Sequence, residues 1–197
     1  MRKIFTVLLV TILMLSLVGC SRKGKTTNVI SQAELNAKEE LFLSVGTTSY
    51  FVFDFKLDDE FKWIDIWVER YEFGEKIDTF IGMGSTLGNE GVFIFAIDES
   101  EGINNWTIVL QDEGGKSTTK ASDKLVIDET KGFSKMWGVN NNIKIADNDI
   151  TLASISYKND GREMFSFTGD FYENPEANKQ QMVNYDIVYL LRIKLSK

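Results

Sequence analysis

From Leu41 onward, apolar residues recur mostly at every second position, and this period constrains the fold more than any other feature of the chain. Such alternation is typical of β-strands that turn one face to a core and the other to solvent. It occurs in "SYFVFDFKL", "NWTIVLQD" and "EMFSFTGDF", and again in the C-terminal "VNYDIVYLLRIKL", which we expect to be half exposed. "GVFIFAID" is apolar on both faces and indicates a central buried strand. The chain is therefore predicted to be mainly all-β.

Short glycine-containing segments separate these strands. Phe73-Gly74-Glu75, Glu113-Gly114-Gly115 and Asn159-Asp160-Gly161 predict hairpin turns, and a single proline, Pro175, occurs in the chain. Roughly nine or ten short strands at this spacing predict an antiparallel β-sandwich, with a closed barrel as the alternative.

Residues 61–73 fit two structures. Ile64, Ile66 and Val68 alternate as in a strand, but Phe61, Ile64, Trp67, Val68 and Tyr71 also fall at helical spacing before Gly74. The β-branched residues and the neighbouring strands favour a strand.

One short helix is expected ahead of the strands. Ser31 and Glu34 have the spacing of a capping box, and Ile30 and Leu35 have the spacing of a hydrophobic staple. These pairs predict a helix over residues 32–40.

The N-terminus has the pattern of an export signal. Arg2 and Lys3 precede an apolar run over residues 4–18, which ends in Leu17, Val18, Gly19 and Cys20. The run is short for a membrane span and fits a secretory signal.

Leu17-Val18-Gly19-Cys20 resembles the lipobox of bacterial lipoproteins. The resemblance implies that Cys20 carries a diacylglycerol and that cleavage follows Gly19, since two acyl chains hold a protein stably at a membrane. The alternatives are an ordinary signal peptide with an incidental cysteine and a transmembrane anchor. Residues 1–19 would then be a signal peptide, 20–30 the lipidated cysteine and a flexible tether, and 31–197 one domain. The protein would lie on the extracytoplasmic face of the cell membrane, or on the outer membrane if the envelope has two.

Composition excludes several kinds of chemistry. The chain contains no histidine, and Cys20 is its one cysteine, so His-based triads and a disulfide in the mature domain are excluded. The formal net charge is −7, which becomes −9 when residues 1–19 are removed, and such a surface disfavours nucleic acid. No glycine-rich phosphate loop occurs, and no cofactor is expected.

Carboxylates in apolar strands are the candidate catalytic groups. Asp54, Asp65 and Glu69 could serve a glycoside hydrolase, which needs two carboxylic acids facing one sugar. The alternative is that they lie on solvent faces or pair with Lys56 and Arg70.

A possible ligand face lies on the strand over residues 63–71. Trp63, Asp65, Trp67, Glu69 and Tyr71 would share one side, where rings stack on sugars and carboxylates accept hydroxyl groups. The alternative is that these rings pack in the core, as we expect for Trp106 and Trp137.

Acidic clusters at residues 58–60 and 147–149 have the carboxylates that a calcium site needs. Neither has the glycine and distal glutamate of an EF-hand loop, and both are expected to be solvated turns or helix caps. No metal is therefore predicted.

The expected function is a non-catalytic binding module at the cell envelope, with an envelope protein or glycan as partner. It follows from the proposed anchor and the missing catalytic residue types. Two alternatives stay open: a carboxylate-based hydrolase of cell-wall glycans, and an assembly or immunity protein that pairs through a β edge.

Overall fold

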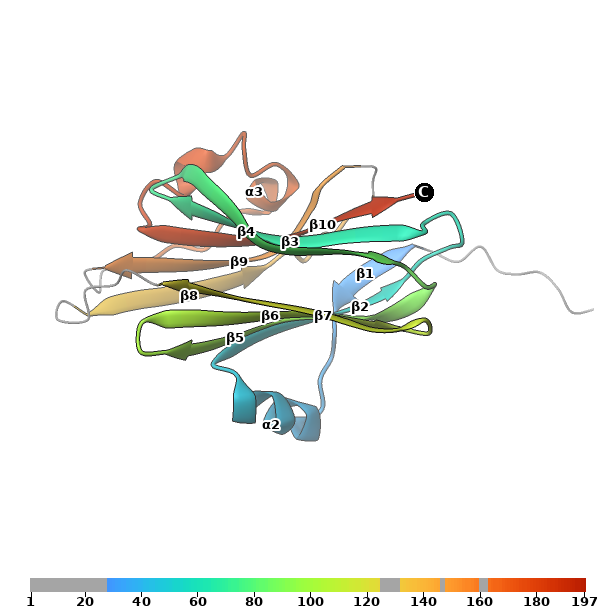
Figure 1. The fold of residues 1–197 in the computed structure, drawn as a ribbon. Helices are drawn as coiled ribbons and strands as arrows, with labels where there is room; N and C mark the ends of the chain where they lie inside the picture. The colour runs from blue at the N-terminus through green and yellow to red at the C-terminus, as the bar shows by residue number, and fades with distance from the viewer. Residues whose placement is uncertain (1–27, 125–131, 146–147, 160–162) are drawn as a thin grey trace, which may run out of the picture.

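The computed structural model describes residues 28–124, 132–145, 148–159 and 163–197. The described residues form two five-stranded antiparallel sheets that face each other across one core (Figure 1). Sheet A contains, in spatial order, β1 (Val29–Gln32), β2 (Ser49–Lys56), β5 (Glu90–Ser100), β6 (Ile103–Asp112) and β7 (Gly115–Lys124). Sheet B contains β4 (Glu75–Thr86), β3 (Trp63–Glu72), β10 (Ile187–Ser196), β9 (Ile150–Asn159) and β8 (Phe133–Val139). The predicted antiparallel β-sandwich is confirmed, and the barrel alternative is wrong.

The core lies between the two sheets and is made by alternate residues of their strands. Sheet A contributes mostly aromatic rings, and sheet B mostly branched aliphatic side chains. Fully buried members include Phe53, Phe93, Phe95, Trp106, Ile66, Val68, Leu152, Ile155 and Leu191. Burying such side chains stabilises the fold by roughly 1.5–3 kcal/mol each. This alternation is the period of two seen in the sequence, and Trp106 lies in the core as predicted.

Residues 63–72 form strand β3, as the β-branched residues predicted. Ile64, Ile66 and Val68 point into the core, and Trp63 and Trp67 lie on the outer face of sheet B. The pairing with β4 shifts register after Val68 and again after Arg70. Bulges of this kind increase local twist and re-aim side chains.

Two predicted hairpins are present. Phe73 and Gly74 connect β3 to β4 with φ of 49° and 83°, the left-handed conformation that a tight type I′ turn requires. Glu113 and Gly114 connect β6 to β7. The third predicted turn, at residues 159–161, lies partly outside the described residues.

The short N-terminal helix is present but begins later than predicted. Helix α2 (Ala37–Gly46) is capped by Asn36, whose side chain accepts from the Glu39 N–H, while Glu39 accepts from the Asn36 N–H. Ser31, the predicted cap, instead pairs with Asp54 in the sheet. Strand β1 also takes in Val29 and Ile30, which the sequence had assigned to the tether.

The C-terminal strand is more buried than predicted. β10 lies between β3 and β9, and nearly every one of its residues is buried, including those on the outer face of sheet B. The expectation of a half-exposed strand is wrong because residues 163–185 fold over that face. The stretch "EMFSFTGDF" is not a strand either, since it leads into helix α3 (Gly169–Glu173), which the 3-10 helix η3 (Lys179–Gln181) follows.

This covering segment makes a second, smaller apolar cluster. Its members are Tyr71, Phe171, Tyr172, Met182, Tyr185, Val188 and Leu190. Figure 1 shows the segment above sheet B and α2 on the opposite side of the sandwich. One end of the outer face of sheet B is thus covered, and the other end is left for a site.

In the part of the chain that the structure describes, no helix has the length and hydrophobicity needed to cross a membrane.

Candidate ligand face on sheet B

The uncovered end of the outer face of sheet B combines indole rings with charged groups. Trp63, Asp65 and Trp67 come from β3, and Arg192 and Lys194 come from the neighbouring β10. Register places Arg192 opposite Trp67 and Lys194 opposite Asp65. We call these five residues the sheet B face.

Trp63 is the exposed ring of the sheet B face. Its indole lies over Gly84 of β4, where an added Cβ would come within 2.7 Å of the ring atom Cζ2. Its Nε1 donates a hydrogen bond of 3.1 Å to Asp65 Oδ1. The residue remains 42% exposed. The glycine and the carboxylate therefore hold the ring in place on the sheet and leave it accessible to a ligand.

Glu69 holds the second ring and its charged neighbours together. It is 3% exposed and accepts hydrogen bonds from Trp67 Nε1 at 3.0 Å, Lys76 Nζ at 2.7 Å and Arg192 Nη1 at 3.0 Å. The Arg192 guanidinium also lies 5.8 Å from the centre of the Trp67 ring, within the range of a cation–π contact. One buried carboxylate thus fixes both the indole and the guanidinium.

The pKa of Glu69 reflects this environment. Burial alone would raise it, but the hydrogen bonds from Lys76 and Trp67, with the charge of Arg192, lower the pKa to about 2. Glu69 is therefore ionised at neutral pH.

Tyr71 lies beyond Glu69 and belongs to the covered end of the sheet. Its hydroxyl oxygen is 3.0 Å from Glu69 Oε2 and 2.7 Å from Glu176 Oε1. Burial raises the pKa of Tyr71, and the two carboxylates raise it further, so the hydroxyl stays protonated. It links strand β3 to the covering segment.

The five residues proposed from the sequence as one ligand face thus divide into two groups. Trp63, Asp65 and Trp67 are at least partly accessible, whereas Glu69 and Tyr71 are buried. The contacts of Glu69 with Lys76 and Arg192 and the cover over Tyr71 account for the division. The accessible platform is therefore shorter than the alternation implied.

The three carboxylates considered for hydrolysis do not come together. Asp54 lies on the outer face of sheet A, because its neighbours Phe53 and Phe55 point into the core. Asp65 and Glu69 lie on the outer face of sheet B, and Glu69 is committed to ion pairs with Lys76 and Arg192. The core separates Asp54 from the other two.

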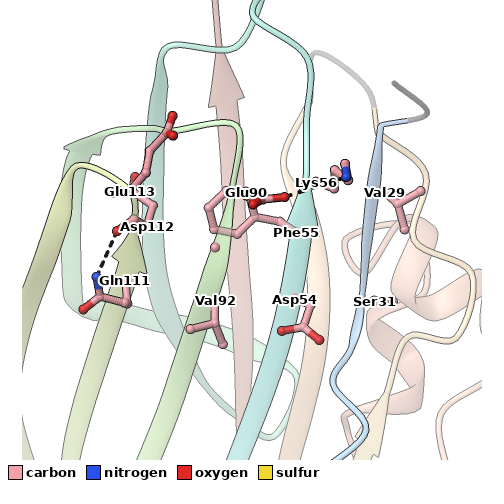
Figure 2. A pocket seen from close by; sticks show the side chains of 11 residues that line it. Val29, Ser31, Asp54, Phe55, Lys56, Glu90, Val92, Gln111, Asp112 and Glu113 are labelled. Carbon is pink, nitrogen blue, oxygen red and sulfur yellow. Dashed lines mark hydrogen bonds and ion pairs between the residues drawn. The ribbon is translucent and has the colours of Figure 1, made fainter. Parts of the chain in front are cut away.

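A wide hollow of about 650 Å³ lies around Asp54 on the outer face of sheet A (Figure 2). Ser31, Asp54, Val92 and Gln111 form a cross-strand row along it. Lys56 is 3.7 Å from Glu90 at its edge. The lining includes no tryptophan or tyrosine, and its one aromatic ring, Phe55, is buried with 3% exposure.

The described residues contain no group of three or more acidic or cysteine side chains placed to hold a metal ion. Asp58 accepts hydrogen bonds from Asn28 Nδ2 at 3.1 Å and from the Glu60 N–H at 3.2 Å. Asp58 therefore stabilises the turn between β2 and β3. Asp147 of the other acidic cluster lies outside the described residues, as does Cys20.

Trp137 corrects one prediction. It was expected in the core, but it lies on the edge strand β8 and is 63% exposed. Its backbone pairs with Ile155, a core residue, so the side chain points to the inner side of the sheet at the open edge of the sandwich. Alternation indicates which side of the sheet Trp137 faces. It does not indicate that the side chain is exposed, because that depends on the position of β8 at the edge of the sheet.

Sequence reasoning missed two residues of this face. Arg192 interrupts the apolar run of β10 and is mostly buried, and a buried charge needs a partner such as Glu69. Gly84 interrupts β4, and glycine within a strand is typical of a close approach by another group. Both signals were visible in the sequence.

The fold and this face define a β-sandwich domain that carries aromatic and charged side chains on the outer side of one sheet. The chain belongs to the YgaN domain family, which matches residues 29–195 and so takes in β1 and all but the last residue of β10. No curated protein and no solved structure matches the chain.

Proposed function

We propose that this protein is a lipid-anchored, non-catalytic module of the bacterial envelope that binds a glycan through the sheet B face. The observation that carries the proposal is the Trp63 ring, which lies next to Gly84, is hydrogen-bonded to Asp65 and is left accessible. An exposed indole beside carboxylate and ammonium groups suits a sugar, whose ring stacks on the indole and whose hydroxyls bind the polar groups.

Binding rather than hydrolysis is supported by the position of the carboxylates. Hydrolysis of a glycoside needs two carboxyl groups within about 5–9.5 Å across one sugar. Asp54 is on the opposite sheet, and Glu69 is buried against Arg192 and Lys76. Of these three carboxylates, only Asp65 lies on the accessible part of the face.

The anchor and location rest on the sequence. Leu17-Val18-Gly19-Cys20 resembles a lipobox, and a glycan of the envelope is a ligand that a protein held there would meet.

The test is a pull-down of the purified domain with insoluble peptidoglycan. Trp63→Ala should lower the affinity about tenfold, because an aromatic contact and its buried area are worth on the order of 1.5 kcal/mol. Trp137→Ala is the matched control, since it removes an exposed indole from a different edge of the sandwich. Equal binding by wild type and Trp63→Ala would refute the proposed face.

Docking of a protein partner is a second candidate function. Helix α2 has no buried residue and leaves Leu41, Phe42 and Val45 exposed. A hollow of about 370 Å³ separates the start of this helix from Trp137. Exposed apolar side chains gathered beside sheet edges are typical of interaction sites.

This candidate predicts a specific cross-linking pattern in cells. A photo-crosslinking amino acid at Phe42 should give one adduct of defined mass, and the same group at Asp54 should give none. Adducts of equal yield from both positions would indicate non-specific contact.

A further inference from the structure

A small polar pocket lies on the sheet B side of the molecule, next to Arg192. Its volume is about 220 Å³, below the range of about 300–1,000 Å³ that drug-sized ligands occupy. It is bounded by residues 140–144 and 148–151 and by helix α3, and its lining includes Asn142, Lys144, Asn148 and Asp149. We call it the Asp149 pocket. Its size suits a single small ring.

The floor and wall of the Asp149 pocket are held by buried contacts. Tyr172 of α3 is buried, and its hydroxyl lies 2.9 Å from Ser154 Oγ on β9. Gly138 of β8 makes room for that hydroxyl, because an added Cβ would lie 2.3 Å from it. Asn140 donates from Nδ2 to the Thr151 carbonyl at 2.9 Å. The pocket therefore has a fixed shape.

Several polar groups at the pocket retain hydrogen-bonding capacity. Asp149 is 3.8 Å from Arg192 and 4.0 Å from Lys194, both longer than a hydrogen bond. Thr151 is 1% exposed, and its Oγ1 has no hydrogen-bond partner in the part of the chain that the structure describes. Nε of Arg192, beside the pocket but not in its lining, also lacks a hydrogen-bond partner among the described residues. Buried polar atoms without partners are uncommon in folded proteins and call for an explanation.

Arg192 and Lys194 lie between this pocket and Trp63 of the sheet B face. Both side chains lie on β10, which separates β9, the strand of Thr151, from β3, the strand of Trp63. Neighbouring strands are about 4.8 Å apart, so Thr151 lies roughly 10 Å from Trp67 across the strands. Trp63 is four residues further along β3, a displacement of about 13 Å. A ligand that touches both the pocket and Trp63 is longer than one sugar ring.

We propose that the Asp149 pocket and Trp63 are two subsites for one linear, uncharged oligosaccharide. This inference rests on the proposed function. The pocket holds one sugar unit through amide and carboxylate groups, and Trp63 stacks on a unit further along the chain. Lys144 lies 2.5 Å from Glu173 and Asp149 faces Arg192, so opposite charges balance at the pocket and do not select an ionic ligand.

The probes are β-1,4-linked N-acetylglucosamine oligomers, titrated calorimetrically against the purified domain. The tetramer should bind at least tenfold more tightly than the dimer, because it reaches both subsites. Asp149→Ala should remove this advantage and lower the tetramer affinity about tenfold to a hundredfold, since a hydrogen bond to a charged group is worth roughly 1.5–3 kcal/mol.

The controls separate this inference from the proposed function. Asp54→Ala, which removes an exposed carboxylate from the opposite sheet, should leave the tetramer advantage unchanged. If Trp63→Ala weakens peptidoglycan binding but Asp149→Ala keeps the tetramer advantage, the pocket is not a subsite and the proposed function stands. If wild type binds none of the oligomers, the assignment of the ligand class is wrong. If wild type binds neither peptidoglycan nor the oligomers, both proposals are wrong.

Discussion

The buried carboxylate of Glu69 gives the sharpest prediction about what holds the sheet B face together. Replacing Glu69 with Gln keeps the shape of the side chain but removes the charge that pairs with Arg192 and Lys76. The pKa of about 2 in the folded protein, against an ordinary value of 4.5, corresponds to roughly 3 kcal/mol at neutral pH, since one pKa unit is worth about 1.4 kcal/mol. We therefore expect Glu69→Gln to lower the free energy of unfolding by about 2–4 kcal/mol.

The pH dependence of this loss follows from the sign of the shift. A carboxyl whose pKa is lowered by folding stabilises the folded state above the unfolded pKa, and the stabilisation disappears as the pH falls from 4.5 towards 2. Between pH 7 and pH 3 the difference between wild type and Glu69→Gln should shrink by roughly 2 kcal/mol. Urea unfolding followed by circular dichroism measures both values.

Glu75→Gln is the matched control for this experiment. Glu75 also pairs with a lysine, Lys179 at 3.1 Å, but its side chain is 74% exposed. Exposed ion pairs contribute about 0–1 kcal/mol, so this change should be small at both pH values. If Glu69→Gln costs no more than Glu75→Gln, or costs the same at pH 3 as at pH 7, the account of Glu69 is wrong.

Four further substitutions test separate parts of the structure. Gly84→Ala places a Cβ 2.7 Å from the Trp63 ring and 2.9 Å from Asp65 Oδ1, so it should weaken peptidoglycan binding while the fold, measured by circular dichroism, is kept. Thr151→Val removes a buried hydroxyl that lacks a partner among the described residues and should raise the free energy of unfolding by about 1 kcal/mol in urea. Gly74→Ala forces a side chain into a turn with φ of 83° and should lower the free energy of unfolding by about 1 kcal/mol or more. Cys20→Ser should abolish incorporation of a labelled fatty acid in cells.

Each of these tests has a result that contradicts it. Gly46→Ala serves as the control for Gly84→Ala, because a Cβ at position 46 meets nothing within 4 Å. The same loss of binding in both variants would argue against the Trp63 contact. Destabilisation by Thr151→Val would mean that its hydroxyl is satisfied. An unchanged unfolding curve for Gly74→Ala, or continued fatty-acid labelling of Cys20→Ser, would refute the corresponding prediction.

The sandwich could be predicted from sequence because its inner faces are made of alternate residues. Phe51, Phe53 and Phe55 on β2, and Ile64, Ile66 and Val68 on β3, show the period of two directly. Left-handed turn residues such as Phe73-Gly74 marked where the strands reverse.

Features that depend on distant segments could not be predicted this way. The outer residues of β10, Val188 and Leu190, are buried because the segment over residues 163–185 packs on them. The alternation of residues within β10 does not indicate that another segment covers this face. The helix start was misplaced because Ser31 and Asn36 both precede a glutamate by three residues. Pairing of Ser31 with Asp54 in the sheet decides between them.

The candidate site was predicted only in part for the same reason. Trp63 and Asp65 could be placed on one strand face, but their exposure depends on Gly84 of the next strand and on where the cover ends. The Asp149 pocket combines β9 with α3, two elements that no local pattern connects.

The position of the site relative to the proposed anchor limits where its ligand lies. Asn28 exchanges hydrogen bonds with Asp58, at 3.1 Å and 2.7 Å, and Asp58 belongs to the loop that leads from β2 into Trp63. The chain therefore enters the domain at the same end as the Trp63 platform. From Cys20 to Asn28 a fully extended chain spans at most about 28 Å. If Cys20 carries the lipid, a glycan bound at Trp63 lies close to the membrane surface rather than at a distance from it. Lengthening the segment before Asn28 with glycine and serine should then extend the reach of the site without changing its affinity for soluble oligomers.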